Sequence, residues 1–167
     1  NYTAAWKKVQ EHVNNNLPAS ALAEVRKIYT QAKKDKQDAQ LIKSLVYIAG
    51  LQDQNREDNE LLSIAKMEKE IKTSREPARS VLNSLLAGMY LNYYEENRWE
   101  LLDRTATAGF VKTDLSTWGT EDFHKRISEL YLLSLKESKQ LQQTRLDAFD
   151  AIITKGNMRH LRPTLYD

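Results

Sequence analysis

The sequence predicts an all-α protein built as an array of antiparallel helical hairpins. Glycine and proline are scarce, with five glycines and three prolines among 167 residues. Apolar residues recur at intervals of three and four along most of the chain, which is the spacing of one helix face. No segment keeps the strict apolar and polar alternation of a half-buried strand. About seven helices are therefore expected in a single domain over residues 1–160, arranged as a tetratricopeptide-like array or as an irregular bundle.

The first two helices are expected on either side of the asparagines at 14–16. Pro18 opens the second helix, because proline suits the first turn, and the charged run 33–36 ends it. Each helix carries an apolar stripe, which is Tyr2, Trp6, Val9 and Val13 in the first and Leu22, Val25, Ile28, Tyr29 and Ala32 in the second.

The third and fourth helices flank a polar turn at 52–60. Asp38 is the candidate N-cap of the third helix and Gly50 its candidate C-terminal stop. Carboxylates in the turn favour the positive start of the fourth helix, which carries Leu61, Leu62, Ile64, Ala65, Glu68 and Ile71. Such short connections allow only antiparallel neighbours. Each of the first two hairpins is about as long as a tetratricopeptide repeat.

The fifth helix is expected to be the longest and the most central. Residues 73–76 have the spacing of a capping box, and Pro77 falls in the first turn, where a missing amide hydrogen costs nothing. Its stripe is too wide for one neighbour and consists of Val81, Leu82, Leu85, Leu86, Met89, Tyr90, Tyr93 and Tyr94.

The last third of the chain alternates short helices and irregular segments. A short apolar turn at 98–102 is followed by a long loop candidate at 103–117. Thr117 or Thr120 is expected to cap the next helix, whose buried side holds Phe123, Ile127, Leu130, Tyr131 and Ser134. A final short helix is expected over 141–153, ended by Gly156. Residues 161–167 read as the start of a further helix, so we expect a fragment of a longer polypeptide.

Composition excludes several classes of protein. Lys and Arg number 25 against 23 Asp and Glu, a net charge of +2 without a basic face, so nucleic acid and anionic membrane are not expected partners. No apolar stretch approaches the ~20 residues of a membrane span. The absence of cysteine excludes disulfides, thiolate metal sites and thiol nucleophiles within these residues.

Catalytic and cofactor motifs are also missing from the sequence. The histidines, His12, His124 and His160, stand on different segments without a second ligand at helical spacing. A hydrolase triad of Ser116, Asp122 and His124 lacks the glycine-rich elbow that positions a serine nucleophile, so solvated surface residues are the favoured interpretation. No glycine-rich phosphate loop is present. The chain is expected not to be an enzyme and to use no cofactor or metal.

One aromatic and basic stretch is a candidate partner surface. Tyrosine, tryptophan and arginine dominate the energetics of protein interfaces. Here the candidate residues are Tyr93, Tyr94, Asn97, Arg98, Trp99 and Arg104. The alternative is that the tyrosines belong to the core, Trp99 plugs the turn and the arginines bond exposed carbonyls.

Scattered motifs resemble the N-terminal helical region of large bacterial alpha-2-macroglobulin-like proteins. They are Ser20-Ala21-Leu22 with Ile28-Tyr29, Asn97-Arg98-Trp99, Arg104-Thr105, Thr117-Trp118, the segment 129–135 and, most specifically, Leu161-Arg162-Pro163-Thr164-Leu165-Tyr166-Asp167. The resemblance implies a parent protein that is exported to the periplasm or cell envelope and traps proteases. In that family a protease cuts a bait segment and the inhibitor changes conformation around it, and many members carry a reactive Cys-Gln thioester. This chain has no such motif.

The expected function follows from the resemblance together with the missing catalytic groups. The chain is expected to be a non-catalytic accessory or interaction domain of such an envelope protein. Its expected partners are other domains of the same polypeptide, a protease or an envelope protein. The alternative is a stand-alone tetratricopeptide-like adaptor that grips a peptide or protein in a concave groove.

Overall fold

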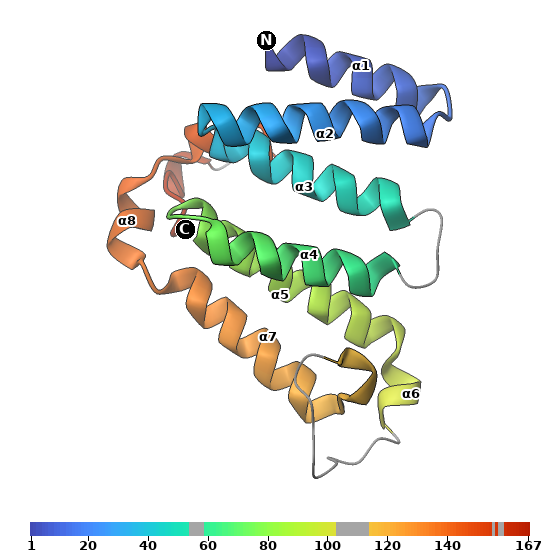
Figure 1. Ribbon diagram of the computed structural model, residues 1–167. Helices are drawn as coiled ribbons and strands as arrows, with labels where there is room; N and C mark the ends of the chain where they lie inside the picture. The colour runs from blue at the N-terminus through green and yellow to red at the C-terminus, as the bar shows by residue number, and fades with distance from the viewer. Residues whose placement is uncertain (54–58, 103–113, 155, 157–158) are drawn as a thin grey trace. The chain divides into compact units, whose positions relative to one another are not determined.

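The computed structural model describes residues 1–53, 59–102, 114–154, 156 and 159–167, and in them it confirms the all-α prediction (Figure 1). These residues form eight α-helices and no strand. About seven helices were expected, and the additional one is α6 (Arg98–Leu102), predicted as a turn. Where the sequence suggests one domain, the chain forms two compact units, one from residues 1–60 and 139–167 and the other from 61–138.

The first unit begins with three helices that pack in chain order. α1 (Tyr2–Asn14), α2 (Pro18–Asp35) and α3 (Asp38–Asp53) lie side by side, with α2 contacting both neighbours (Figure 1). Their shared core contains buried Val9, Val25 and Ile28 from the predicted apolar stripes, together with Ala21 and Leu51. The predicted hairpin of the first two helices is therefore present in this unit, whereas the expected third and fourth helices belong to different units.

The turns of the first unit use residues in the left-handed backbone region. Asn16 follows α1 with φ of 56°, a conformation that asparagine tolerates better than most residues. Lys36 ends α2 with φ of 57°, and its amide bonds the carbonyl of Ala32. Both turns are short and reverse the chain direction.

Two predicted boundaries of the third helix are wrong. Gly50 does not stop α3, which continues to Asp53. Asp38 is the first helical residue and not the N-cap, because the carbonyl of Gln37 accepts the bond from the Leu41 amide. Glycine lowers helix propensity by about 1 kcal/mol, and this local preference is overridden by the packing of the helix.

The C-terminal part of the first unit differs from the predicted helices. α8 (Ser138–Gln143) is followed by the 3-10 turns η2 (Leu146–Phe149) and η3 (Arg159–Leu161). The expected helix over 141–153 is therefore wrong beyond Gln143. The backbone of 144–146 instead bonds that of 163–165, from the Leu146 amide to the Pro163 carbonyl at 2.9 Å and from the Leu165 amide to the Thr144 carbonyl at 3.0 Å.

The last residues of the chain form a turn where a helix start was expected. Thr164 lies in the bridge opposite Arg145, and its amide donates to Asp167 Oδ2 at 3.0 Å. The Thr164 hydroxyl donates to the same oxygen at 2.8 Å. The backbone bonds of Pro163 and Leu165 thus go to a distant segment rather than to a helical turn.

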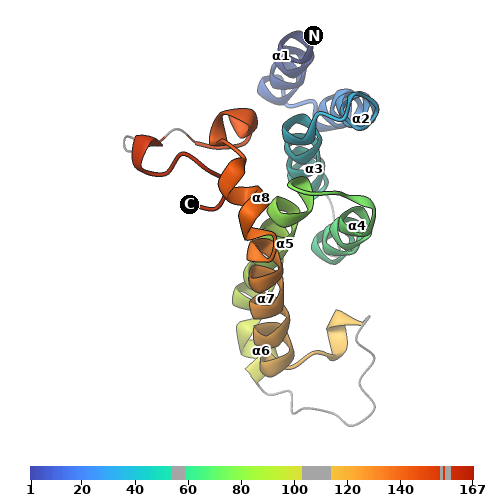
Figure 2. The same cartoon turned by 90° about the vertical axis from the view of Figure 1, so that its left-hand side faces the viewer.

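The second unit is built around the pairing of two long helices. It contains α4 (Asn59–Thr73), α5 (Ala78–Glu96), α6, the 3-10 turn η1 (Leu115–Thr117) and α7 (Thr120–Leu135). In Figure 2 α7 lies in front of α5 and follows its direction, and the extensive contact between the two helices confirms the expected wide apolar stripe of the fifth helix. The buried side of α7 holds Phe123, Ile127 and Leu130, as predicted, but Tyr131, which was expected on the same side, is exposed.

The helix caps of the second unit differ from the predicted ones. The box at 73–76 does not form: α4 ends at Thr73, and Glu76 Oε2 accepts from the Ser80 amide at 3.1 Å instead. Pro77 precedes the first residue of α5. Neither Thr117 nor Thr120 caps α7, which begins after Gly119.

Candidate functional site

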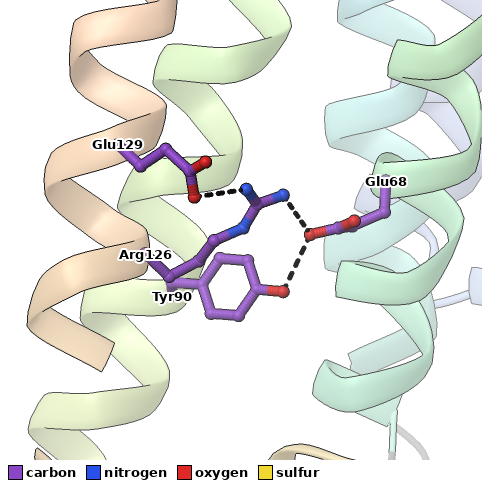
Figure 3. A network of polar contacts seen from close by, with 4 residues as sticks. All are labelled: Glu68, Tyr90, Arg126 and Glu129. Carbon is purple, nitrogen blue, oxygen red and sulfur yellow. Dashed lines mark hydrogen bonds and ion pairs between the residues drawn. The ribbon is translucent and has the colours of Figure 1, made fainter. Parts of the chain in front are cut away.

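A polar network joins three helices of the second unit. Arg126 on α7 donates from Nη2 to Glu68 Oε1 on α4 at 2.8 Å, and from Nη1 to Glu129 Oε2 at 2.9 Å (Figure 3). The hydroxyl of Tyr90 on α5 donates to the same oxygen of Glu68 at 2.9 Å. Glu68 therefore links α4 to both helices of the central pair.

The network is partly shielded from water, so the interactions between its charges are screened less than at a fully exposed site. The side chains of Arg126 and Glu68 are 26% and 29% exposed. Burial alone lowers the pKa of Arg126, but the bonds to Glu68 and Glu129 outweigh it, so the pKa rises and the guanidinium stays charged. Burial, aided by the Glu68 carboxylate, raises the pKa of Tyr90 above its ordinary value.

The raised pKa of Tyr90 predicts a loss of stability at alkaline pH. Below pH 10.0, the ordinary pKa of tyrosine, the phenol is neutral in both states and its stabilising bond to Glu68 is fully present. As pH rises further, the unfolded state loses this proton before the folded state does, so the free energy of unfolding falls. We expect it to fall less steeply in Tyr90→Phe than in the parent, measured by urea unfolding between about pH 9 and 11. Equal slopes would contradict the bond.

The network borders a pocket of about 670 Å³ that lies within the second unit. Two helix faces line it, each with residues spaced by three, four and seven positions, so each set projects from one side of its helix. These are Leu61, Ile64, Ala65 and Glu68 on α4, and Asp122, Lys125, Arg126 and Glu129 on α7. The other lining residues in the described part of the chain are Tyr90 on α5 and Asp114, Leu115 and Trp118 at η1.

Two residues of the pocket lining, Tyr90 and Trp118, belong to an aromatic cluster. The rings of Tyr90 and Trp118 are stacked, with centroids 5.5 Å apart and planes 5° apart. Phe123 packs edge-on against Trp118 at 5.1 Å, and Tyr93 stacks on Phe123 at 5.7 Å. Offset-stacked and edge-to-face pairs of this kind hold aromatic rings in fixed positions.

The carboxylates of the lining already serve as hydrogen-bond acceptors. Asp122 Oδ2 accepts from the Gly119 amide at 3.0 Å and so caps α7. Asp114 accepts from the Ser116 hydroxyl and amide, which lowers the pKa of its carboxyl. Among the described residues, no group of three or more His, Asp or Glu side chains is arranged to hold a metal ion.

The residues of the imagined hydrolase triad have other roles. Ser116 donates to Asp114 at 2.5 Å, and Asp122 accepts from Gly119. His124 packs its ring edge-on against Tyr94, with centroids 5.0 Å apart. These contacts support the interpretation of the three residues as helix-end and surface groups.

Comparisons with protein-family models, curated proteins and solved structures find no significant match to this chain.

The structure separates the residues of the predicted partner surface. Tyr94 is buried and Tyr93 is half-buried against Phe123, so both belong to the aromatic cluster. Asn97 ends α5, where its side-chain amide donates to the Tyr93 carbonyl at 2.8 Å. Arg104 lies outside the described residues, as do positions 103–113 of the predicted loop, and 115–117 form η1.

Trp99 does not plug the turn. Among the described residues of that set, Trp99 and Arg98 are exposed surface groups at α6. The side chain of Trp99 is 80% exposed, and the guanidinium of Arg98 lies 5.9 Å from the centroid of its ring. This distance is within the range of a cation–π interaction at an exposed site.

Sequence reasoning missed the polar network. Glu68 belongs to the stripe predicted for the fourth helix. A charged residue in an otherwise apolar stripe indicates that it pairs with another charged or polar group at a buried or half-buried position. The spacing of Arg126 and Glu129 by three positions also predicts their ion pair. The link between Glu68 and Arg126 has no local signal, because 58 residues separate the two.

Proposed function

We propose that this chain is a non-catalytic interaction and positioning domain of a cell-envelope protein of the alpha-2-macroglobulin type. The observation that carries the interaction role is the 80% exposure of Trp99, a residue type that is usually buried and that anchors many interfaces. The resemblance of the sequence motifs to that family supports the parentage. The proposed partners are other domains of the same polypeptide, a protease or an envelope protein.

The pocket supports binding rather than catalysis. A general acid or base needs a pKa matched to its task and a place within reach of the substrate. Here the guanidinium of Arg126 is held by two carboxylates, and Asp114 and Asp122 accept from neighbouring backbone amides. Groups tied in this way fix the geometry of the unit.

Two measurements test the proposal. An antibody raised against residues 1–167 is expected to detect a polypeptide far larger than the 19.4 kDa of this chain, in the envelope fraction of the source cells. Detection in the cytoplasmic fraction at the mass of this chain would overturn the parentage and favour the adaptor alternative. In the second measurement the isolated chain is titrated against proteases, and strong stoichiometric inhibition would overturn the accessory role.

The adaptor alternative has one observation in its favour. α1 packs on α2 and α2 packs on α3, as consecutive helices do in repeat arrays. On this alternative the first unit would bind a peptide by itself, without a larger parent. None of the described helices combines the length and apolarity that a bilayer span requires.

Replacing Trp99 with alanine is expected to weaken association without unfolding the domain. An exposed side chain contributes little to stability, so the free energy of unfolding should change by no more than about 0.5 kcal/mol. Affinity for the partner captured by the intact protein should fall by about tenfold or more, measured by interferometry. Lys69→Ala, on the exposed side of α4, is the matched control. A large loss of stability in Trp99→Ala would instead assign the ring to the core.

A further inference from the structure

The described residues that line the pocket of the second unit have a net charge of opposite sign to that of the whole chain. Among the described residues of the lining, four carboxylates face two cations, a formal balance of −2, whereas the chain carries +2. Arg126 is paired with Glu68 and Glu129, so within the described part of the lining Lys125 is the cation that remains against Asp114 and Asp122. An acidic pocket bordered by apolar walls attracts a cation that carries apolar carbon atoms.

The pocket is larger than a single ion needs. Its volume of about 670 Å³ lies in the range of sites for small organic ligands. The seven-residue step from Asp122 to Glu129 spans about 10 Å along the helix axis, which equals about three residues of extended peptide. A short peptide segment therefore matches the length of the groove between the two helix faces.

The walls suit an arginine or lysine side chain. The methylene stem of such a residue would contact Leu61, Ala65 and Leu115, while its charged end would reach the carboxylates. The polar network uses one oxygen of Glu68 and one of Glu129. A carboxylate accepts about four hydrogen bonds, so the same glutamates are able to accept from a second cation.

We infer that this pocket binds a basic side chain, arginine or lysine, presented by a short extended segment of a partner protein. Glu129 and Asp114 are exposed residues of the lining, so an approaching cation would contact them first. Lys125 repels a basic side chain because both are positively charged, and it therefore lowers the affinity of the pocket for that side chain. The inference concerns a different surface from Trp99, and it stands whether or not the chain has the proposed parent.

The test is a titration of the full chain with the blocked tripeptide acetyl-Gly-Arg-Gly-amide, followed by the indole ¹⁵N–¹H signal of Trp118. The variants Trp6→Phe and Trp99→Phe each remove one of the three indole signals and so identify it. We expect saturable binding with a Kd of about 1 mM at low salt, weakening as salt is added. The matched neutral peptide, with citrulline in place of arginine, should bind at least about tenfold more weakly.

Three variants locate the binding in the pocket. Glu129→Gln is expected to weaken binding of the arginine peptide by about fivefold, and Lys125→Gln to strengthen it by a similar factor. Glu137→Gln, an exposed residue that does not line the pocket, should leave the Kd unchanged. Both pocket positions are exposed, so the variants should fold, which far-ultraviolet circular dichroism verifies.

The outcomes separate the inference from its rivals. Equal binding of the citrulline peptide, or tighter binding of an aspartate peptide, would overturn it. Spermidine binding as tightly as the arginine peptide would show that the pocket recognises cations in general and would overturn the assignment to a peptide segment. If the Trp118 indole signal does not shift at about 10 mM peptide, the inference is also overturned. That outcome leaves the mass and fractionation test of the proposed function unaffected.

Discussion

Phe123→Ala is expected to lower the free energy of unfolding by about 4 kcal/mol, the largest effect of any substitution considered for this chain. The side chain is fully buried on α7. Four aromatic rings lie with centroids within 6.4 Å of it, those of Tyr90, Tyr93, Tyr94 and Trp118. Alanine would remove all of these contacts and leave a cavity between α5 and α7.

The matched control is Leu132→Ala on the same helix, where the leucine is 72% exposed. Its effect should stay within about 0.5 kcal/mol. Both variants are compared by urea unfolding, followed by circular dichroism and by tryptophan fluorescence, which reports on Trp118 in the cluster. A loss below about 1 kcal/mol for Phe123→Ala would contradict the central place of this ring.

Arg126→Met is expected to cost about 2 kcal/mol of stability. Methionine keeps much of the apolar stem but removes the guanidinium, which leaves the half-buried Glu68 carboxylate without its cation. Hydrogen bonds to charged groups contribute about 1.5–3 kcal/mol, and solvent at this site moderates the value. The pair with Glu129, whose side chain is 57% exposed, should add little.

A double-mutant cycle separates the two partners of Arg126. Coupling between Arg126→Met and Glu68→Gln is expected to be about 1–2 kcal/mol, and coupling with Glu129→Gln no more than about 0.5 kcal/mol. The measurement is urea unfolding of the single and double variants at neutral pH. Equal couplings would mean that α4 is not held to the central helices through Glu68.

The helices were predictable because their signal is local and repeated. Apolar stripes at helical spacing located α1, α2, α5 and α7 with nearly correct limits. The end of the predicted last helix was not predictable, because the bonds of residues 144–146 go to 163–165, about twenty positions away. A helix continuing from Gln143 would have had to compete with those backbone bonds.

The candidate site was less predictable than the fold. The sequence is compatible with Tyr93 and Tyr94 lying either in the core or on a partner surface. Their packing against Phe123 assigns both to the core. Trp99 lies five residues after Tyr94, yet one is exposed and the other buried. The pocket depends on α4, η1 and α7 meeting in space, which periodicity within one helix does not report.

The measurement that most directly tests an interaction role is photo-crosslinking in the native protein. Benzoylphenylalanine is introduced at Trp99 and, as the matched control, at the exposed Lys69 of α4, and crosslinked peptides are identified by mass spectrometry after irradiation of intact cells. We expect position 99 to crosslink specifically to a protein segment outside residues 1–167, and position 69 to give only background. Background at both positions would contradict the proposal that this domain acts by contacting other proteins through Trp99.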